Sequence, residues 1–153
     1  MKSTKDYLIV QILLSIGCLE FFGPMVKDTG ESHLLNLEWV GHARIHLAWL
    51  LGYMFFSGLA NLYFIWFRSP KTKDNLVIAA IWQMMHILGF WFAVALAPTY
   101  HGQLVDEHYH IFIFGIEENV FVFGVLTLIL GAAIYFLRKI DTPSLKQESP
   151  IIS

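Results

Sequence analysis

The chain has 153 residues, of which 56% are apolar and only 14% are charged, and its mean hydropathy is +0.57. A typical soluble domain carries about 25% charged residues, so this chain has too few charges to cover a water-exposed surface, and its length leaves room for one domain. The net charge of -2 argues against a basic nucleic-acid-binding surface, and the single cysteine excludes an internal disulfide framework.

Four apolar stretches are each long enough to cross a bilayer as a helix, which requires about 20 residues. We expect the first three at 7–23, 40–67 and 76–97, with Pro24 ending the first. The fourth begins at a position between 109 and 119 and ends near 137. The runs lack the two-residue alternation of strands, and an open strand in lipid would leave backbone groups unpaired. The sequence therefore predicts an all-α four-helix transmembrane bundle at 1–140 and a short polar tail at 141–153.

Two segments admit more than one interpretation. Residues 108–115 fit either an extended interfacial segment or the first turns of the fourth helix. The first span also resembles a signal peptide, with Lys2 and Lys5 before an apolar run and a faint lipoprotein cleavage box at 15–18. Cleavage there would leave three spans, so four spans are the preferred prediction.

The distribution of lysine and arginine predicts the orientation in the membrane. Basic residues gather at the two ends of the chain and in the second connection: Lys2, Lys5, Arg68, Lys71, Lys73, Arg138, Lys139 and Lys146. The first connection has Lys27 and the third has none. We therefore expect both termini and the second connection to be cytoplasmic, and the first and third connections to face outward, as in a multi-pass integral membrane protein.

The histidines concentrate on the predicted outward side. Six of the seven lie in the two outward connections or the adjoining helix ends: His33, His42, His46, His101, His108 and His110. At about 1.5 Å per helical residue, His46 lies roughly 31 Å from Phe67 and Glu118 roughly 29 Å from Leu137, and Glu20 also belongs to the outer third. His86 falls near the midplane. Ionisable residues at such depths are costly and mark candidate sites.

A metal centre is one chemical interpretation of this pattern. Glu38, His42 and His46 recur every four residues, so a helix places them on one stripe. Two imidazoles one turn apart, with carboxylates from another helix, suit iron, zinc, copper or manganese. The candidate metal ligands are His42, His46, Glu117, Glu118 and His33, and the candidate catalytic residues are Glu38, Glu20, Arg44 and His86.

Each of these assignments has a structural alternative. The histidine pair would be a hydrogen-bonded interfacial pair, and His86 a hydrogen-bonded interhelical residue. Arg44 would clamp an anionic head group or pair with Glu38 or Glu118. Haem between His46 and His86 is disfavoured because the two lie at different depths.

Two packing expectations complete the pattern. Small residues at Gly124, Thr127 and Gly131 predict close helix packing along the fourth span. Glu20 lies about half a turn away from the face that carries Gln11, Ser15 and Cys18. We therefore expect only one of these two faces to dominate the interior.

One spaced motif occupies the first third of the chain. It comprises Gly23, Pro24, Asp28, His33, Asn36, Trp39, His42, Ala43, Arg44 and His46. It resembles the motif of a group of small four-span membrane proteins of unknown function, in which a proline stands where this chain has Leu37. The resemblance implies four helices and a special role for this segment, and it implies no activity.

The functional hypothesis is a metal-dependent, oxidoreductase-like membrane enzyme acting on a lipophilic substrate in an outward-facing His/Glu pocket. The alternatives are a metal-free lipid or sterol isomerase or lipid-binding protein, similar only in shape to sterol-isomerase bundles, and a small accessory subunit of a membrane complex. The expected partners are the bilayer, a lipophilic small molecule and a second copy or a membrane complex, and no nucleic acid.

Overall fold

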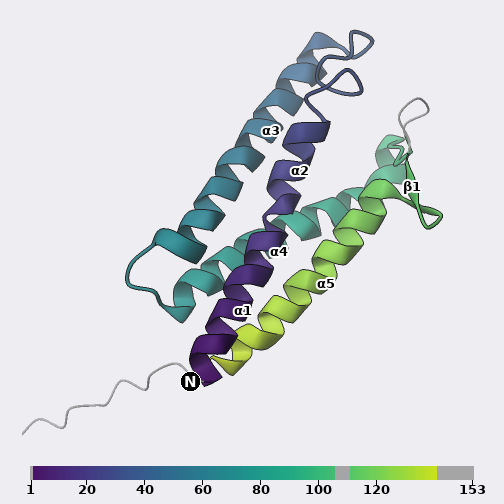
Figure 1. The fold of residues 1–153 in the computed structure, drawn as a ribbon. Coiled ribbons are helices and arrows are strands. Elements are labelled where there is room, and N and C mark those ends of the chain that lie inside the picture. Colours follow the sequence, from purple (N-terminus) through teal and green to yellow (C-terminus); the bar gives the residue numbers. More distant parts are fainter. Residues whose placement is uncertain (1, 106–110, 141–153) are drawn as a thin grey trace, which may run out of the picture.

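The computed structural model describes residues 2–105 and 111–140. These residues form five α-helices, two short helices of other types and two short strands, and Figure 1 shows their arrangement. The elements in chain order are α1 (Lys2–Gly17), α2 (Leu19–Lys27), α3 (Gly41–Leu62), the π-helical η1 (Tyr63–Phe67), α4 (Lys73–Leu96), the 3₁₀-helical η2 (Ala97–Tyr100), β1 (Phe112–Ile113), β2 (Ile116–Glu117) and α5 (Glu118–Lys139).

The prediction of an all-α bundle with four spans is confirmed at the level of length and composition. Four helical segments among the described residues are long and apolar enough to cross a membrane: Thr4–Lys27, Gly41–Phe67, Lys73–Tyr100 and Glu118–Lys139. The predicted second span matches α3 with η1.

The first span differs from the prediction at both Pro24 and Cys18. Pro24 lies inside α2 and does not end it, because a proline removes only its own N–H and the helix resumes when the Asp28 N–H donates to the Pro24 carbonyl at 2.7 Å. The interruption comes earlier, at Cys18, between α1 and α2. The first of the four segments that could span a membrane is therefore two consecutive helices.

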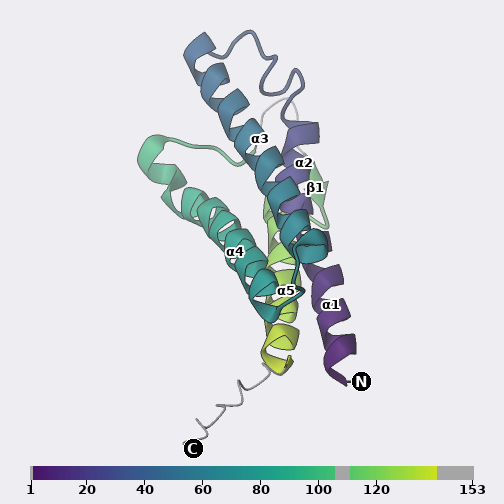
Figure 2. The same ribbon diagram turned by 90° about the vertical axis from the view of Figure 1, so that its left-hand side faces the viewer.

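The helices pack in a defined set of pairs. α1 lies along α5, α2 lies along α3, and α4 contacts α5, α1 and η1. Figure 1 shows α3 and α4 diverging from the short connection that joins them, and Figure 2 shows the same helices from the side. The buried apolar core draws on α1, α4 and α5 in particular, through Val10, Leu14, Leu76, Ala79, Leu126, Leu130 and Ala133.

Buried polar side chains tie α1 to the neighbouring elements. Gln11 Nε2 donates to the Ile65 carbonyl of η1 at 2.6 Å. Trp66 Nε1 donates to Ser15 Oγ at 2.8 Å. Such interhelical bonds contribute about 0.6 kcal/mol each on average in a membrane protein, so they fix the relative positions of the helices more than they add to total stability.

Close packing occurs at glycines other than those predicted. A Cβ at Gly58 in α3 would lie 2.5 Å from the Phe22 ring of α2, and a Cβ at Gly17 would collide with the Gln83 side chain. At Gly124 and Gly131 a Cβ would meet no atom within 4 Å among the described residues. Within the described residues, the two glycines of the predicted seam thus make no close contact, whereas Thr127 accepts a hydrogen bond from Trp91 Nε1 of α4 at 3.0 Å.

The segment before α5 is extended. β1 and β2 pair antiparallel with Phe112 opposite Glu117 and Ile113 opposite Ile116. The two loop residues, Phe114 and Gly115, have φ values of 52° and 79°, which match the left-handed turn that two-residue hairpins favour. The extended interpretation of this stretch is therefore confirmed for residues 111–115, whereas residues 108–110 and the predicted tail at 141–153 lie outside the described residues.

Candidate functional site

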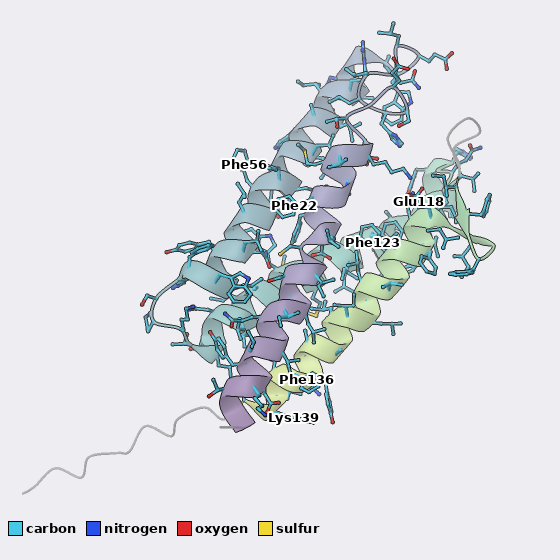
Figure 3. The ribbon with its side chains drawn as sticks, viewed as in Figure 1. Phe22, Phe56, Glu118, Phe123, Phe136 and Lys139 are labelled. Carbon is cyan, nitrogen blue, oxygen red and sulfur yellow. The ribbon has the colours of Figure 1, made fainter. Side chains whose placement is uncertain are left out.

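A cavity of about 830 Å³ lies among the helices. Aromatic and aliphatic side chains form most of its wall, from α2, α3, α4 and α5. On one side Phe123, labelled in Figure 3, stacks on Phe90 of α4 with ring centroids 3.9 Å apart. A concave, mainly apolar site with a few polar groups is the usual form of a small-molecule site. The polar residues in its lining are Asp28, His33, Tyr53, Trp82, His86 and Asn119.

The cavity is open between α3 and α4. Leu50 and Tyr53 on α3 and Ile81 and Met85 on α4 line it, and all four side chains are exposed. These residues lie well inside the apolar spans of the two helices. The opening thus lies within stretches long and apolar enough to cross a membrane, and α2 and α5 form the opposite wall.

The inner polar group of the site is the pair Glu20 and His86. Glu20 comes from α2 and His86 from α4, and Glu20 Oε2 lies 3.9 Å from His86 Nδ1. The Glu20 side chain is 0% exposed and that of His86 is 18% exposed. Both Glu20 oxygens and His86 Nδ1 are buried without a hydrogen-bond partner. A separation of 3.9 Å is longer than a hydrogen bond. A displacement of either side chain by about 1 Å would bring Glu20 Oε2 and His86 Nδ1 into hydrogen-bonding distance.

His86 is the member of this pair that reaches the cavity. Its ring packs between Phe21, at a centroid distance of 4.9 Å, and Phe123, at 6.0 Å. His86 lines the cavity and Glu20 lies behind it. Since Nδ1 is the nitrogen nearest Glu20, Nε2 is the nitrogen left for a molecule in the cavity.

Glu20 is buried because α2 packs against α3 and α4. Gln11, Cys18 and Glu20 are all buried, so the expectation that only one face of the first span would dominate the interior is wrong. Cys18 keeps right-handed helical angles, but α1 packs mainly against α5 whereas α2 packs mainly against α3, so the two halves of the span bury different faces. Each half of the span thus presents its own polar face to the bundle.

A second acid–histidine pair lies at the end of α2. Asp28 Oδ1 is 3.9 Å from His33 Nδ1, and both residues line the cavity. Burial raises the pKa of the Asp28 carboxyl, as does the nearby Glu118 carboxylate, while His33 and Lys27 act in the opposite direction. His33 Nδ1 also lies 2.9 Å from Ser32 Oγ, and its ring packs edge-on against Trp39.

An ion pair between α2 and α5 borders this end of the cavity. Lys27 Nζ pairs with Glu118, which Figure 3 labels at the start of α5. The neighbouring Glu117 caps α5, because its Oε2 accepts from the Val120 N–H at 3.0 Å and its Oε1 from Asn119 at 2.9 Å. Both predicted carboxylate ligands are therefore engaged with protein groups.

His42 and His46 form a separate exposed pair on α3. Their Nε2 atoms are 3.0 Å apart and their ring centroids 4.6 Å apart. Neither makes an ion pair with a carboxylate in the described part of the chain. Glu38 is exposed in the preceding loop, and its N–H donates to Asn36 Oδ1 at 2.9 Å.

Arg44, another predicted catalytic residue, is not joined to the other candidate residues by an ion pair in the part of the chain that the structure describes. Its Nε is buried without a hydrogen-bond partner. Within residues 2–105 and 111–140 it forms no ion pair, and Glu118 is paired with Lys27 instead. The predicted pairing of Arg44 with Glu38 or Glu118 is therefore not observed.

The predicted metal ligands do not form one group. No cluster of three or more His, Cys, Asp or Glu side chains suited to a metal ion occurs among the described residues. His42 and His46 meet each other, His33 meets Asp28, and Glu118 meets Lys27. The donor set thus fits at most a two-histidine site, and His108 and His110 lie outside the described residues.

Sequence reasoning assigned roles to Glu20 and His86 but gave none to Asp28. The available signal was its position one residue after the end of the first span, within the spaced motif. No known protein family, curated protein or solved structure matches the chain.

Proposed function

We propose that this protein is a multi-pass membrane enzyme that binds a lipophilic small molecule in the cavity and moves a proton on it, as a metal-independent isomerase does. The observation that carries the proposal is the Glu20–His86 pair on an apolar wall, with three buried polar atoms lacking partners. Leaving a polar group buried without a partner costs about 1–3 kcal/mol. Such unsatisfied groups in a cavity are characteristic of sites kept for binding or catalysis.

The pair has the composition of a general acid–base dyad. A carboxylate beside one imidazole nitrogen orients the ring and stabilises the imidazolium that forms when the other nitrogen takes a proton. His86 Nε2 accepts a proton from a carbon activated by a neighbouring double bond or carbonyl. It then returns a proton to a different carbon of the same molecule. A double bond changes position, and the reaction consumes no oxidant, reductant or metal.

The surroundings of the dyad suit this chemistry. Phe21 and Phe123 pack against the His86 ring, and Phe90 stacks on Phe123. These apolar surroundings limit the exchange of the transferred proton with water. The opening between α3 and α4 admits a substrate sideways from the bilayer. The basic residues favour an orientation with this end of the bundle toward the outer leaflet.

The test is deuterium incorporation. The purified protein in lipid nanodiscs would be incubated in D₂O with a lipid extract from the host membranes, and the lipids would be analysed by mass spectrometry. We expect one lipid species to gain carbon-bound deuterium. His86→Gln and Glu20→Gln are expected to slow the gain by about 100-fold or more. His101→Asn, at an exposed position outside the cavity, is the matched histidine control.

Two results would contradict this function. If no lipid gains deuterium and none copurifies with the protein, the cavity does not bind a substrate. If His86→Gln exchanges as fast as the unmodified protein, the dyad is not the proton carrier.

A second candidate function is transition-metal binding at His42 and His46. The supporting observation is that two exposed imidazole Nε2 atoms lie 3.0 Å apart on one face of α3, a spacing suited to one ion. Water or a second copy of the chain would supply the remaining ligands. This keeps the metal-dependent hypothesis as a separate proposal, apart from the cavity.

A further inference from the structure

Two acid–histidine pairs lie at the cavity, and three of their four residues line it, with Glu20 behind His86. The inner pair is Glu20 with His86, and the outer pair is Asp28 with His33. Eight residues separate Glu20 from Asp28 along the first span, which corresponds to roughly 12 Å at the helical rise. A molecule lying along α2 would therefore meet one polar pair at each end and aromatic side chains between them.

The outer end carries an excess of negative charge. Among the described residues, this end carries the carboxylates Asp28, Glu117 and Glu118 and the cations Lys27 and Arg44, and Lys27 pairs with Glu118. The lining of the cavity contains no lysine or arginine among the residues that the structure describes. Within the same residues, His33 is the only group in ion-pair range of Asp28. The partly buried Asp28 carboxylate thus lacks a full cationic partner.

The chemistry of the missing partner follows from these groups. An ammonium group offers three donors and no acceptor, and it supplies the positive charge that Asp28 lacks. His33 offers a ring nitrogen as a second acceptor at 3.9 Å from the same carboxylate. A carboxylate or phosphate head group would instead be placed beside Asp28 and Glu118, where like charges repel.

We infer that the cavity binds an amphiphile with one apolar chain and a protonated amine head, and that Asp28 and His33 hold the ammonium group. The chain runs inward from Asp28 along α2 toward His86, over a length comparable to the rise of roughly 12 Å from Glu20 to Asp28. This inference rests on the proposed function because it concerns the same cavity, and it assigns the substrate class and the residues that select it.

The test compares three probes with the same chain and different heads. Dodecylamine, dodecanol and dodecanoate, each brominated near the chain end, would be added to the protein in nanodiscs. Bromine quenches tryptophan fluorescence on contact, and Trp82 lines the cavity. The Trp82-specific quenching is the difference between the quenching of the unmodified protein and that of Trp82→Phe. It would be measured as a function of the mole fraction of each probe in the bilayer.

We expect dodecylamine to quench at roughly tenfold lower mole fraction than dodecanol, because charge-assisted hydrogen bonds are the stronger kind. Dodecanoate is expected to give no Trp82-specific quenching. In Asp28→Asn, dodecylamine should quench Trp82 only at the mole fraction that dodecanol requires. In Asp28→Glu, dodecylamine should still quench at a lower mole fraction than dodecanol. Glu31→Gln, which removes an exposed carboxylate that does not line the cavity, should leave the preference unchanged.

The outcomes separate this inference from the proposed function. Equal quenching by amine and alcohol, or an amine preference that persists in Asp28→Asn, would overturn the ammonium assignment, and deuterium exchange would remain unaffected. Trp82-specific quenching by none of the three probes would overturn both this inference and binding in the cavity.

Discussion

Gln83 of α4 donates a hydrogen bond from Nε2 to the Leu14 carbonyl oxygen of α1 at 2.7 Å. The same amide nitrogen lies 3.3 Å from Asn61 Oδ1 of α3. Gln83 is one helical turn from His86, so this junction fixes α4 directly below the unpartnered dyad. The scaffold around the site is hydrogen-bonded, whereas both Glu20 oxygens and His86 Nδ1 have no hydrogen-bond partner.

Gln83→Met is expected to weaken the bundle. The substitution keeps the side-chain volume, removes the bond to Leu14 and leaves Asn61 without its donor, at a cost of about 1 kcal/mol. The apparent melting temperature in detergent should fall, and deuterium exchange at the site should slow because His86 is less well positioned. Gln103→Met at an exposed position is the control. An unchanged melting temperature would show that the junction carries no stability.

Glu20→Leu is expected to have the opposite effect on stability. Glu20 is buried with both oxygens unpartnered, so replacing it with an apolar residue should raise stability by about 1 kcal/mol or more while abolishing proton transfer. Thermal unfolding and the deuterium assay measure the two effects on one sample. A lower melting temperature would mean that the carboxylate makes a stabilising interaction in the resting protein.

Gly58→Ala should disrupt the contact between α2 and α3. A Cβ there would lie 2.5 Å from the Phe22 ring, so the helices must separate or the ring must move, at a cost of about 1–3 kcal/mol. Gly124→Ala is the matched control, because a Cβ at that position meets no described atom within 4 Å. It should be neutral or slightly stabilising, since alanine favours helix. Equal melting temperatures for the two variants would contradict this packing.

The stability of the protein should depend on pH through Asp28. Burial raises the pKa of this carboxyl, Glu118 adds to the effect, and His33 and Lys27 reduce it. The folded state therefore holds the proton to a higher pH than the unfolded state does. Stability is then expected to fall as the pH rises above the ordinary carboxyl range near 4. The melting temperature should depend less on pH in Asp28→Asn than in the unmodified protein. An identical dependence in the variant would exclude Asp28 as the source.

Zn²⁺ titration tests the histidine pair on α3. His42→Gln and His46→Gln should each abolish the heat of binding in calorimetry, because each removes one of the two imidazole donors. His33→Gln should leave it unchanged, since His33 pairs with Asp28 instead. Binding that survives both α3 substitutions would place the metal elsewhere or exclude a site on this helix.

The fold could be predicted from the sequence because its main signal is local. Runs of apolar residues fix the existence and extent of the four spans, as Gly41–Phe67 illustrates. What happens inside a span depends on contacts between helices. The break at Cys18 and the continuation through Pro24 left no clear trace in the hydropathy pattern. Likewise, Gly17 and Gly58 are closely packed because Gln83 and Phe22 lie opposite them. These contacts join residues far apart in the sequence, so the local pattern around each glycine does not indicate them.

The candidate site could be predicted only in part for the same reason. Counting residues along each helix placed Glu20 in the outer third and His86 near the midplane. It did not give the rotation of the helices about their axes. That rotation is what brings Glu20 Oε2 to 3.9 Å from His86 Nδ1. The spacing of His42 and His46 correctly indicated one face of a helix. It did not reveal that the carboxylates Glu117 and Glu118 are engaged by the α5 cap and by Lys27.

The gap between α3 and α4 that exposes Leu50, Tyr53 and Met85 has a practical consequence for every assay of this protein. A compound that enters sideways from hydrocarbon equilibrates with the acyl-chain phase, so its effective concentration is its share of the surrounding lipid and not its amount in the buffer. Diluting the protein into more inert lipid at a fixed total amount of compound should empty the cavity. Detergent tails of similar length would compete for the same space.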